Sequence, residues 1–295
     1  MNLFPLIVAA LLGSASAAQL TVLASADPAQ IHVRVSQDDW FAQRPDAPGD
    51  SAALNLLRNV ARLLPDPRSG AEVVCLPPQG QAVVVFTDAF GYAICQFPAV
   101  PVGEVRVAVQ GASPVQVTPP DFSRATRITV TDLDDTLIRT GVAQGRALQN
   151  VLTANGTTRP IFAEMPAFLQ HQATLGPVVY LSNSPDGLLV SLEALLRIHH
   201  FPAGPLFLRD LLRESAAEHK AAVLDALART TTARLILVGD SGERDPEVYR
   251  RFVQDHPGRV ERVLIRDVST PARLEEVQRL FSPLEVPLTL LPAAP

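Results

Sequence analysis

Residues 127–136 read Arg-Ile-Thr-Val-Thr-Asp-Leu-Asp-Asp-Thr, and this stretch decides the fold. Its first five residues are rich in β-branched side chains, which is typical of a buried strand. Two carboxylates, Asp132 and Asp134, follow that strand directly. Parallel sheets place their ligands at the carboxyl ends of their strands, so this segment predicts a functional edge as well as a strand.

Further strands with the same character follow along the chain, at 178–182 (VVYLS), 234–240 (RLILVGD) and 259–267 (RVERVLIRD). Helical stretches separate them. One contains a leucine face over 188–196, which we expect Ser184 to cap, with Pro185 in the first turn. Strands that alternate with helices predict an α/β fold with a doubly wound, Rossmann-like parallel sheet and helices on both faces.

The amino-terminal half has a different sequence pattern. Residues 19–122 contain short, valine-rich runs with alternating positions, which predict a small β-sandwich-like domain. One helix interrupts them near 51–64, where Ser51 can cap a stretch of leucines at helical spacing. The proline-rich joint at 114–123 (PVQVTPPDFS) then leads to a catalytic domain, which we assign to residues 123–295.

Composition excludes several classes of protein. The chain has 295 residues, 47% of them hydrophobic and 19% charged, and this balance is typical of a globular protein. The formal net charge of −5 supplies no basic field, so nucleic-acid binding is not expected as its main task.

Residues 1–18 carry no charged side chain and combine a short apolar run with an Ala-Ser-Ala step. This pattern predicts a secretory signal peptide with cleavage near Ala17 or Ala18, and export to a periplasmic or secreted location. The competing interpretations are an N-terminal strand or a retained anchor. Cys75 and Cys95 lie in apolar runs beyond this segment. In an oxidising compartment they can form a disulfide, and otherwise they are two buried thiols; both interpretations remain open.

The carboxylates after the first strand can divide the work of a phosphoryl transfer. Asp132 can attack phosphorus, while Asp134 protonates the leaving oxygen, because a carboxylate nucleophile alone expels an alkoxide poorly. Ser182 and Asn183 end the next strand and can hydrogen-bond a phosphoryl oxygen. Lys220, near the start of a helix, can neutralise the phosphoryl charge.

The strand at 234–240 ends in Asp240, which together with Asp132 would supply hard oxygen ligands for Mg²⁺. The predicted metal ligands are Asp132, Asp134, Asp240 and Asp245. For Asp245 a second role is open, since an aspartate before Pro246 is also a good helix N-cap.

Two other motifs are similar to parts of this sequence, but neither matches it fully. A calcium loop that began at Asp132 would need glycine at its sixth position and glutamate at its twelfth, where this chain has Leu137 and Ala143. The string Gly-Asp-Ser-Gly at 239–242 mimics the nucleophile segment of a serine protease. However, it follows a strand of an α/β half, whereas that protease architecture is all-β.

Taken in order, these segments resemble the haloacid-dehalogenase-like phosphatases over about 125–270. They are more narrowly similar to the actin-patch-associated phosphatidate phosphatases. The similar blocks are VTDLDDTLIRTGV, VVYLSNSP, FPAGPLFLRD, the His219-Lys220 pair, LILVGDSGERDPEVY and VLIRDV, with VFTDAFGYAICQF upstream.

The resemblance implies Mg²⁺-dependent hydrolysis of a phosphomonoester, with phosphatidate as the known lipid substrate. It implies an aspartyl-phosphate formed on Asp132, with Asp134 as acid/base, Ser182 and Lys220 as phosphoryl binders and Asp240 as metal ligand. Asp245 matches a second acidic position of that loop. One departure is Asp186, where relatives usually carry an aromatic residue, and this departure puts lipid specificity in question.

The short intervals between Thr136, Ser182 and Lys220 leave no room for a large cap domain, so we expect an open site with a minimal cap. Such a site admits a bulky phosphomonoester, such as a lipid head group reached by transient contact with a membrane surface. The alternatives are an exported phosphatase for other phosphomonoesters or phosphoproteins, and a non-catalytic binding module. No basic amphipathic helix in the sequence identifies a surface for contact with lipid.

Overall fold

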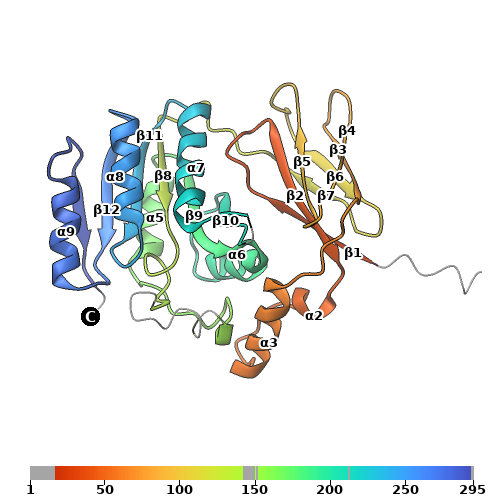
Figure 1. Cartoon of the computed structure of the whole chain (residues 1–295), viewed down its shortest axis with the longest axis horizontal. Helices are drawn as coiled ribbons and strands as arrows, with labels where there is room; N and C mark the ends of the chain where they lie inside the picture. The colour runs from red at the N-terminus through yellow and green to blue at the C-terminus, as the bar shows by residue number, and fades with distance from the viewer. Residues whose placement is uncertain (1–16, 142–149, 151, 212, 294–295) are drawn as a thin grey trace, which may run out of the picture. The chain divides into compact units, whose positions relative to one another are not determined.

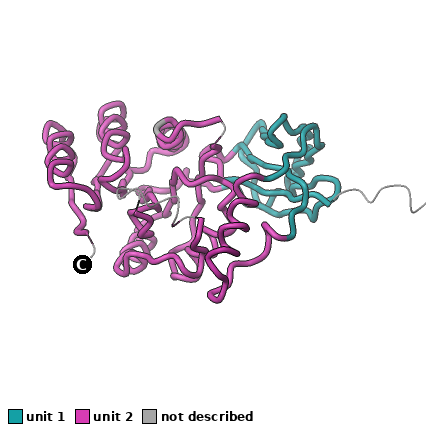
Figure 2. Tube along the Cα trace, turned by 60° about the horizontal axis from the view of Figure 1, so that its bottom comes forward, with its two compact units in different colours: residues 1–23, 29–40, 65–119 teal, residues 24–28, 41–64, 120–295 magenta. Residues whose placement is uncertain are grey.

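The computed structural model describes residues 17–141, 150, 152–211 and 213–293 (Figure 1). The chain divides into two compact units (Figure 2). The first contains the described residues up to 23 together with 29–40 and 65–119. The second contains 24–28, 41–64 and the described residues from 120 onward.

The first unit is a pair of antiparallel sheets. One has the order β1 (Ala18–Leu23), β2 (Gln30–Gln37), β5 (Tyr92–Gln96), and the other β4 (Val83–Phe86), β3 (Glu72–Leu76), β6 (Val105–Val109), β7 (Val115–Val117). Alternate residues of both sheets, such as Val33 and Val107, are buried in a shared core. The predicted sandwich-like domain is therefore confirmed. The cysteines form a disulfide between Cys75 of β3 and Cys95 of β5, so it links the two sheets.

The predicted signal peptide lies outside the described residues except at its end. There, the backbone N–H of Ala18 donates to the carbonyl of Gly111 at 2.8 Å, and the carbonyl of Ala17 accepts from the N–H of Asp38 at 2.9 Å. The sandwich thus begins at the position where the sequence predicts cleavage. Cleavage itself stays a prediction.

The second unit is built on a six-stranded parallel sheet, as predicted. Its order is β10 (Leu206–Arg209), β9 (Val178–Pro185), β8 (Arg127–Thr131), β11 (Arg234–Asp240), β12 (Val260–Arg266), β13 (Leu288–Leu291). The strand that precedes Asp132 and Asp134 is β8, and it lies near the centre of the sheet between β9 and β11. A central strand is buried on both faces, which explains its continuous run of β-branched residues.

Helices cover both faces of this sheet (Figure 1). Successive residues of β9 point to opposite sides: Val179 and Leu181 join one apolar cluster, and Val178 and Tyr180 join the other. The first cluster includes residues of α7 (Ala216–Thr230), α8 (Asp245–Asp255) and α9 (Pro271–Phe281), and the second includes residues of α5 (Met165–Ala173) and α6 (Leu189–Ile198). Among the described residues, no helix combines the length and apolar character needed to cross a membrane.

Two helices that precede this sheet in sequence also group with it. They are α2 (Trp40–Gln43) and α3 (Ala52–Leu63), and residues 41–64 belong to the second unit. The helix itself follows the prediction, because Ser51 accepts from the backbone N–H of Leu54 at 3.2 Å. Its placement differs from our assignment of residues 19–122 to the β-rich domain. The physical reason is hydrogen bonding: Asn55 and Asn59 of α3 donate to backbone carbonyls of residues 152–154.

Candidate active site

The sequence-predicted site residues come together at the carboxyl edge of the parallel sheet. Asp132 directly follows β8, Ser182 lies near the end of β9, and Asp240 ends β11. Because β8 pairs with both β9 and β11, these three positions are neighbours at one edge. Lys220 comes from the second turn of α7, and Asp245 is the first residue of α8.

Lys220 links two of the carboxylates. Its buried Nζ lies 2.8 Å from Oδ1 of Asp132 and 2.5 Å from Oδ1 of Asp245, with Oε2 of Glu243 at 3.8 Å. Burial alone would lower the pKa of this ammonium, but the charges of Asp132 and Asp245 outweigh it and raise the pKa well above its ordinary value. Lys220 is therefore a fixed positive charge beside Asp132.

Asp132 is held firmly and is buried. Its Oδ2 accepts from the hydroxyl of Thr136 at 3.2 Å, and its backbone N–H donates to the carbonyl of Val238 at 2.9 Å. Burial raises the pKa of Asp132 well above its ordinary value; Lys220 opposes this shift, and Asp245 adds to it. The ionised form that a nucleophile requires is thus costly unless a further positive charge is present.

Three carboxylates form a cluster suited to a metal ion. Asp132, Asp240 and Asp245 each offer an oxygen, and these oxygens lie within 4.8 Å of one another. Oδ1 of Asp240 accepts from the backbone N–H groups of Gly242 (2.6 Å) and Glu243 (2.9 Å), whereas its buried Oδ2 has no hydrogen-bond partner among the described residues. Clustered carboxylate oxygens, one of them without a partner, fit a hard divalent cation.

Asp245 faces this cluster and does not cap its helix. The N-cap position of α8 is Arg244, with no side-chain cap. Oδ2 of Asp245 instead lies 3.4 Å from the backbone nitrogen of Asp240. A Cβ at Gly239 would stand only 2.3 Å from that Oδ2, so the close approach of the carboxylate requires glycine there.

Asp134, predicted as acid/base and as a metal ligand, has its carboxylate among hydroxyl groups. Its Oδ2 accepts from Ser184 Oγ at 2.6 Å and from Ser182 Oγ at 3.3 Å, while its buried Oδ1 has no partner among the described residues. Burial raises the pKa of Asp134, and the hydrogen bond from Ser184 and the charge of Arg159 partly offset this rise. Asp134 is therefore a better proton carrier than its ordinary pKa would make it.

Ser184 is a residue of the candidate site that the sequence did not predict. We predicted it as a helix N-cap, and that prediction is wrong, because Ser184 belongs to β9 and α6 begins only at Leu189. A 3₁₀ turn, η1 (Asp186–Leu188), separates them, and Asp186 is buried within it. Strand periodicity was the available signal, since Ser182 and Ser184 lie two residues apart and share one face.

The side chain of Asn183 contacts a different carboxylate of the site, that of Glu243. Its Nδ2 donates to Oε2 of Glu243 at 3.0 Å. Glu243, which we did not assign, is thus shared between Asn183 and Lys220.

Several contacts stabilise the loop that carries Asp132 and Asp134. Oδ1 of Asp135, whose φ is +54°, accepts from the backbone N–H groups of Thr140 (2.8 Å) and Gly141 (2.7 Å). The buried Arg266 donates from Nε to the carbonyl of Thr136 at 3.0 Å, and its guanidinium stacks 3.9 Å from the ring centroid of Phe162. These contacts hold the loop in one conformation, which fixes the positions of Asp132 and Asp134.

The described part of the interval between β8 and β9 adds α5 and a series of turns, but no additional sheet or compact unit. This agrees with the minimal cap expected from the sequence.

The fold and the site have the arrangement of a haloacid-dehalogenase-like phosphatase domain: a parallel sheet presents two aspartates after one strand, a hydroxyl after the next, a buried lysine and a further acidic loop. Residues 127–267 match the family model of the phosphatidate phosphatase APP1 catalytic domain.

Two curated fungal proteins are similar to the chain. An uncharacterized protein of Schizosaccharomyces pombe is 26% identical over 149 residues, which cover 47% of this chain and 25% of the relative. The phosphatidate phosphatase APP1 of Saccharomyces cerevisiae is 28% identical over 165 residues, which cover 50% of this chain and 28% of the relative. The matched region is thus about a quarter of the length of each curated relative.

Proposed function

We propose that the chain is a Mg²⁺-dependent phosphomonoester hydrolase that acts through an aspartyl-phosphate, with phosphatidate as its substrate. The observation that carries the proposal is the buried Asp132, which Lys220 contacts at 2.8 Å and which lies in a cluster with Asp240 and Asp245. The family match over residues 127–267 supports phosphatidate as the substrate.

In this mechanism Asp132, Asp240 and Asp245 would hold the cation. When bound, the cation supplies positive charge that offsets the acidic excess and lets a phosphate approach. Lys220 contributes a second positive charge from the protein itself, directed at the oxygen of Asp132. The two positive charges favour the ionised form of Asp132, which can then act as a nucleophile.

The chemistry then proceeds in two steps. A carboxylate oxygen of Asp132 forms a bond to phosphorus as the bond from phosphorus to the alkoxide oxygen breaks. Asp134, protonated at the unpartnered Oδ1, gives its proton to that leaving oxygen. Asp134 next accepts a proton from water, which attacks phosphorus and releases inorganic phosphate from Asp132. Ser182 and Asn183 would bind phosphoryl oxygens during both steps.

The test is phosphate release from a soluble aryl phosphate and from phosphatidate micelles, each with Mg²⁺ and with a chelator. We expect Mg²⁺-dependent release from both, with phosphatidate preferred by kcat/KM. A preference for soluble phosphomonoesters or phosphoproteins would replace the lipid substrate. No release from any substrate would favour the binding-module alternative.

We also propose that the chain is exported. The disulfide between Cys75 and Cys95 supports this, because disulfides persist in oxidising compartments. The uncharged, apolar character of residues 1–18 supports it as well. N-terminal sequencing of the secreted or periplasmic protein tests the proposal, with a new terminus expected near Ala17 or Ala18 and retention of Met1 in a cytosolic fraction as the contrary result.

A further inference from the structure

Helix α3 (Ala52–Leu63) buries its polar face and exposes its apolar face. Surface helices usually bury an apolar stripe and expose a polar one. Here the large apolar side chains of Leu56, Leu57 and Val60 are 38%, 62% and 39% exposed, and Leu64 just beyond the helix is 76% exposed. The buried residues of α3 are all polar: Asn55, Arg58, Asn59 and Arg62.

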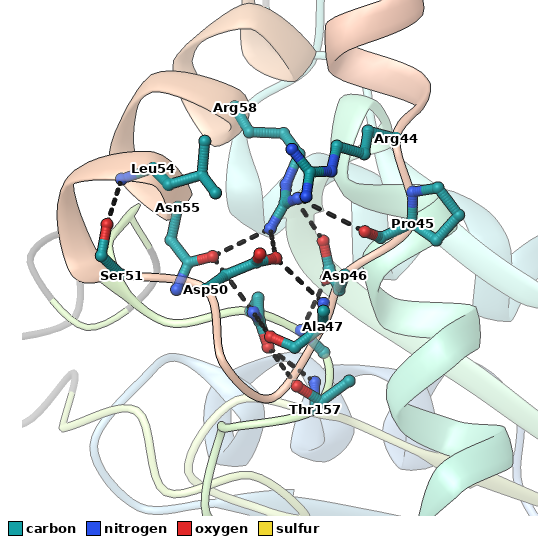
Figure 3. Close-up of polar contacts among 12 residues, drawn as sticks. Arg44, Pro45, Asp46, Ala47, Asp50, Ser51, Leu54, Asn55, Arg58 and Thr157 are labelled. Carbon is teal, nitrogen blue, oxygen red and sulfur yellow. Dashed lines mark hydrogen bonds and ion pairs between the residues drawn. The ribbon is translucent and has the colours of Figure 1, made fainter.

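A dense polar network explains why the polar face lies inside (Figure 3). Arg58 pairs with Asp50 at 2.6 Å and with Asp46 at 3.3 Å, and Arg62 pairs with Asp46 at 2.8 Å. Oδ2 of Asp46 also accepts from the backbone N–H of Gly156 at 2.7 Å. Through these ion pairs and hydrogen bonds inside the second unit, the polar residues of α3 hold its apolar face outward.

The network extends to the active-site side of the sheet. Oδ2 of Asp46 accepts from the hydroxyl of Ser191, near the start of α6. A Cβ at Gly187 would stand 2.1 Å from the backbone carbonyl of Arg62, so α3 packs closely on η1. Because η1 directly follows the segment of β9 that holds Ser182 and Ser184, α3 lies at the carboxyl edge where the substrate would enter.

Other exposed apolar residues lie near that edge. Val190 follows η1 and is 44% exposed, and Leu211 follows the carboxyl end of β10 and is 45% exposed. The outer surface of residues 41–64 is also nearly free of charge. Side chains of the two aspartates and two arginines in the network are at most 6% exposed, which leaves Arg44 as the exposed charge of this segment.

We propose that the outer face of α3, formed by Leu56, Leu57, Val60 and Leu64, is an interfacial helix that inserts into a lipid surface and positions the active site over it. The inference rests on the proposed function for its lipid substrate. An uncharged apolar helix face is complementary to the acyl boundary of a lipid surface.

The size of the face favours lipid over a second copy of the chain. A 12-residue helix is about 18 Å long and about 10 Å wide, so its outer face covers roughly 200 Å². A stable protein interface buries about 800 Å² on each partner. Insertion into lipid needs no such area, because each buried leucine contributes about 2 kcal/mol by itself.

The experiment uses the full chain and sedimentation with phosphatidylcholine vesicles, prepared with and without phosphatidate. The test variant is Leu57→Glu with Val60→Glu, and the matched control is Leu175→Glu, at a position 42% exposed that precedes β9 at the opposite edge of the sheet. We expect the double variant to lose vesicle binding by about tenfold or more and the control to bind as the wild type does. Since the net charge of the chain is −5, apolar burial must supply the affinity, and binding should persist at high salt.

Activity measurements distinguish a failure of this inference from a failure of the proposed function. The double variant should lose hydrolysis of vesicle phosphatidate by about the same tenfold factor, and should keep the wild-type rate on a soluble aryl phosphate. Binding that depends on α3 without any phosphatase activity would overturn the proposed function alone. Equal vesicle binding by the wild type and the double variant would overturn this inference alone, as would a wild-type dimer, seen by light scattering, that the double variant dissociates without any loss of vesicle binding.

Discussion

The second unit contains two buried polar clusters, and their charge balance differs. The active site gathers five carboxylates around the buried Lys220, with Arg159 also near: Asp132, Asp134, Asp240, Glu243 and Asp245. The α3 network sets the two aspartates Asp46 and Asp50 against the two arginines Arg58 and Arg62.

The same contrast appears in individual atoms. In the site, buried oxygens of Asp134 and Asp240 have no hydrogen-bond partner among the described residues. In the network, both oxygens of Asp46 have partners, Arg62 for Oδ1 and Gly156 and Ser191 for Oδ2. A charge-balanced cluster stabilises a fold, whereas an unbalanced one is maintained for a ligand that supplies the missing charge. Substitutions in the active site and in the α3 network test this distinction.

The largest effect is expected at the nucleophile. Asp132→Asn should lower phosphate release from an aryl phosphate by at least ~10³-fold, because the amide cannot attack phosphorus. Thermal unfolding should show a melting temperature no lower than that of the wild type, since the change removes a buried charge from an acidic cluster. Asp255→Asn, at an exposed side chain in α8, serves as the control and should keep full activity. Activity of Asp132→Asn within tenfold of the wild type would exclude Asp132 as the nucleophile.

In the α3 network, removal of one carboxylate charge should lower the stability of the fold. Asp46→Asn should lower the free energy of unfolding by about 3–5 kcal/mol at neutral pH, because it removes the counter-charge of the buried Arg62 and leaves the buried Arg58 with Asp50 alone. Urea denaturation measures this loss, and the exposed Asp255→Asn should change the same free energy by less than about 1 kcal/mol. A loss from Asp46→Asn as small as that of the control would contradict the stabilising role of the network.

The pH dependence of that loss has a definite sign. Burial raises the pKa of Asp46, but the hydrogen bonds from Gly156 and Ser191 and the charge of Arg62 outweigh it, so the folded-state pKa lies below 3.8. The stabilisation is therefore fully present above the unfolded pKa and is lost as the pH falls through the folded value. The difference in unfolding free energy between wild type and Asp46→Asn should be constant from about pH 5 to 8 and shrink below about pH 3.8. A difference that grows on acidification would contradict this sign.

The next prediction concerns the missing positive charge of the site. Mg²⁺ at about 100 times its Kd should stabilise the wild type by about 2.7 kcal/mol against unfolding. Burial, with the charge of Asp245, raises the pKa of Asp240 well above its ordinary value. Asp240→Asn should therefore leave the metal-free protein at least as stable as the wild type and remove most of the Mg²⁺ effect. Calorimetry with and without Mg²⁺ measures both, and equal stabilisation of the two proteins would exclude Asp240 as a ligand.

The smallest effect is expected at Ser184. Ser184→Ala removes the 2.6 Å hydrogen bond to Asp134 and should lower kcat by about tenfold, the value of a hydrogen bond to a charged group. Ser184→Thr retains a hydroxyl and should recover part of that loss. An unchanged kcat for Ser184→Ala would mean that this contact does not position the acid/base.

Much of the catalytic half was predictable because its signals are local. A buried strand followed by Asp132 and Asp134 identifies both the strand and the edge of the sheet where chemistry occurs. Parallel topology then brings Ser182 and Asp240 to the same edge, since β8 pairs with both neighbouring strands. The role of Ser184 was not predictable in the same way, because Ser-Pro before a leucine-rich helix is also a good cap signal, and only the length of β9 decides between the two.

By itself, the sequence determined which residues of this protein share a strand or a helix face, since side-chain periodicity depends on the backbone alone. It identified the helix that begins after Ser51 and the order of the catalytic segments. Only the tertiary structure decided which face of α3 is buried, because burying its polar residues requires partners from other segments, including the carbonyls of residues 152–154 that accept from Asn55 and Asn59. The tertiary structure likewise left the active-site carboxylates without enough positive charge, since that balance depends on which groups the fold brings within a few ångströms of one another.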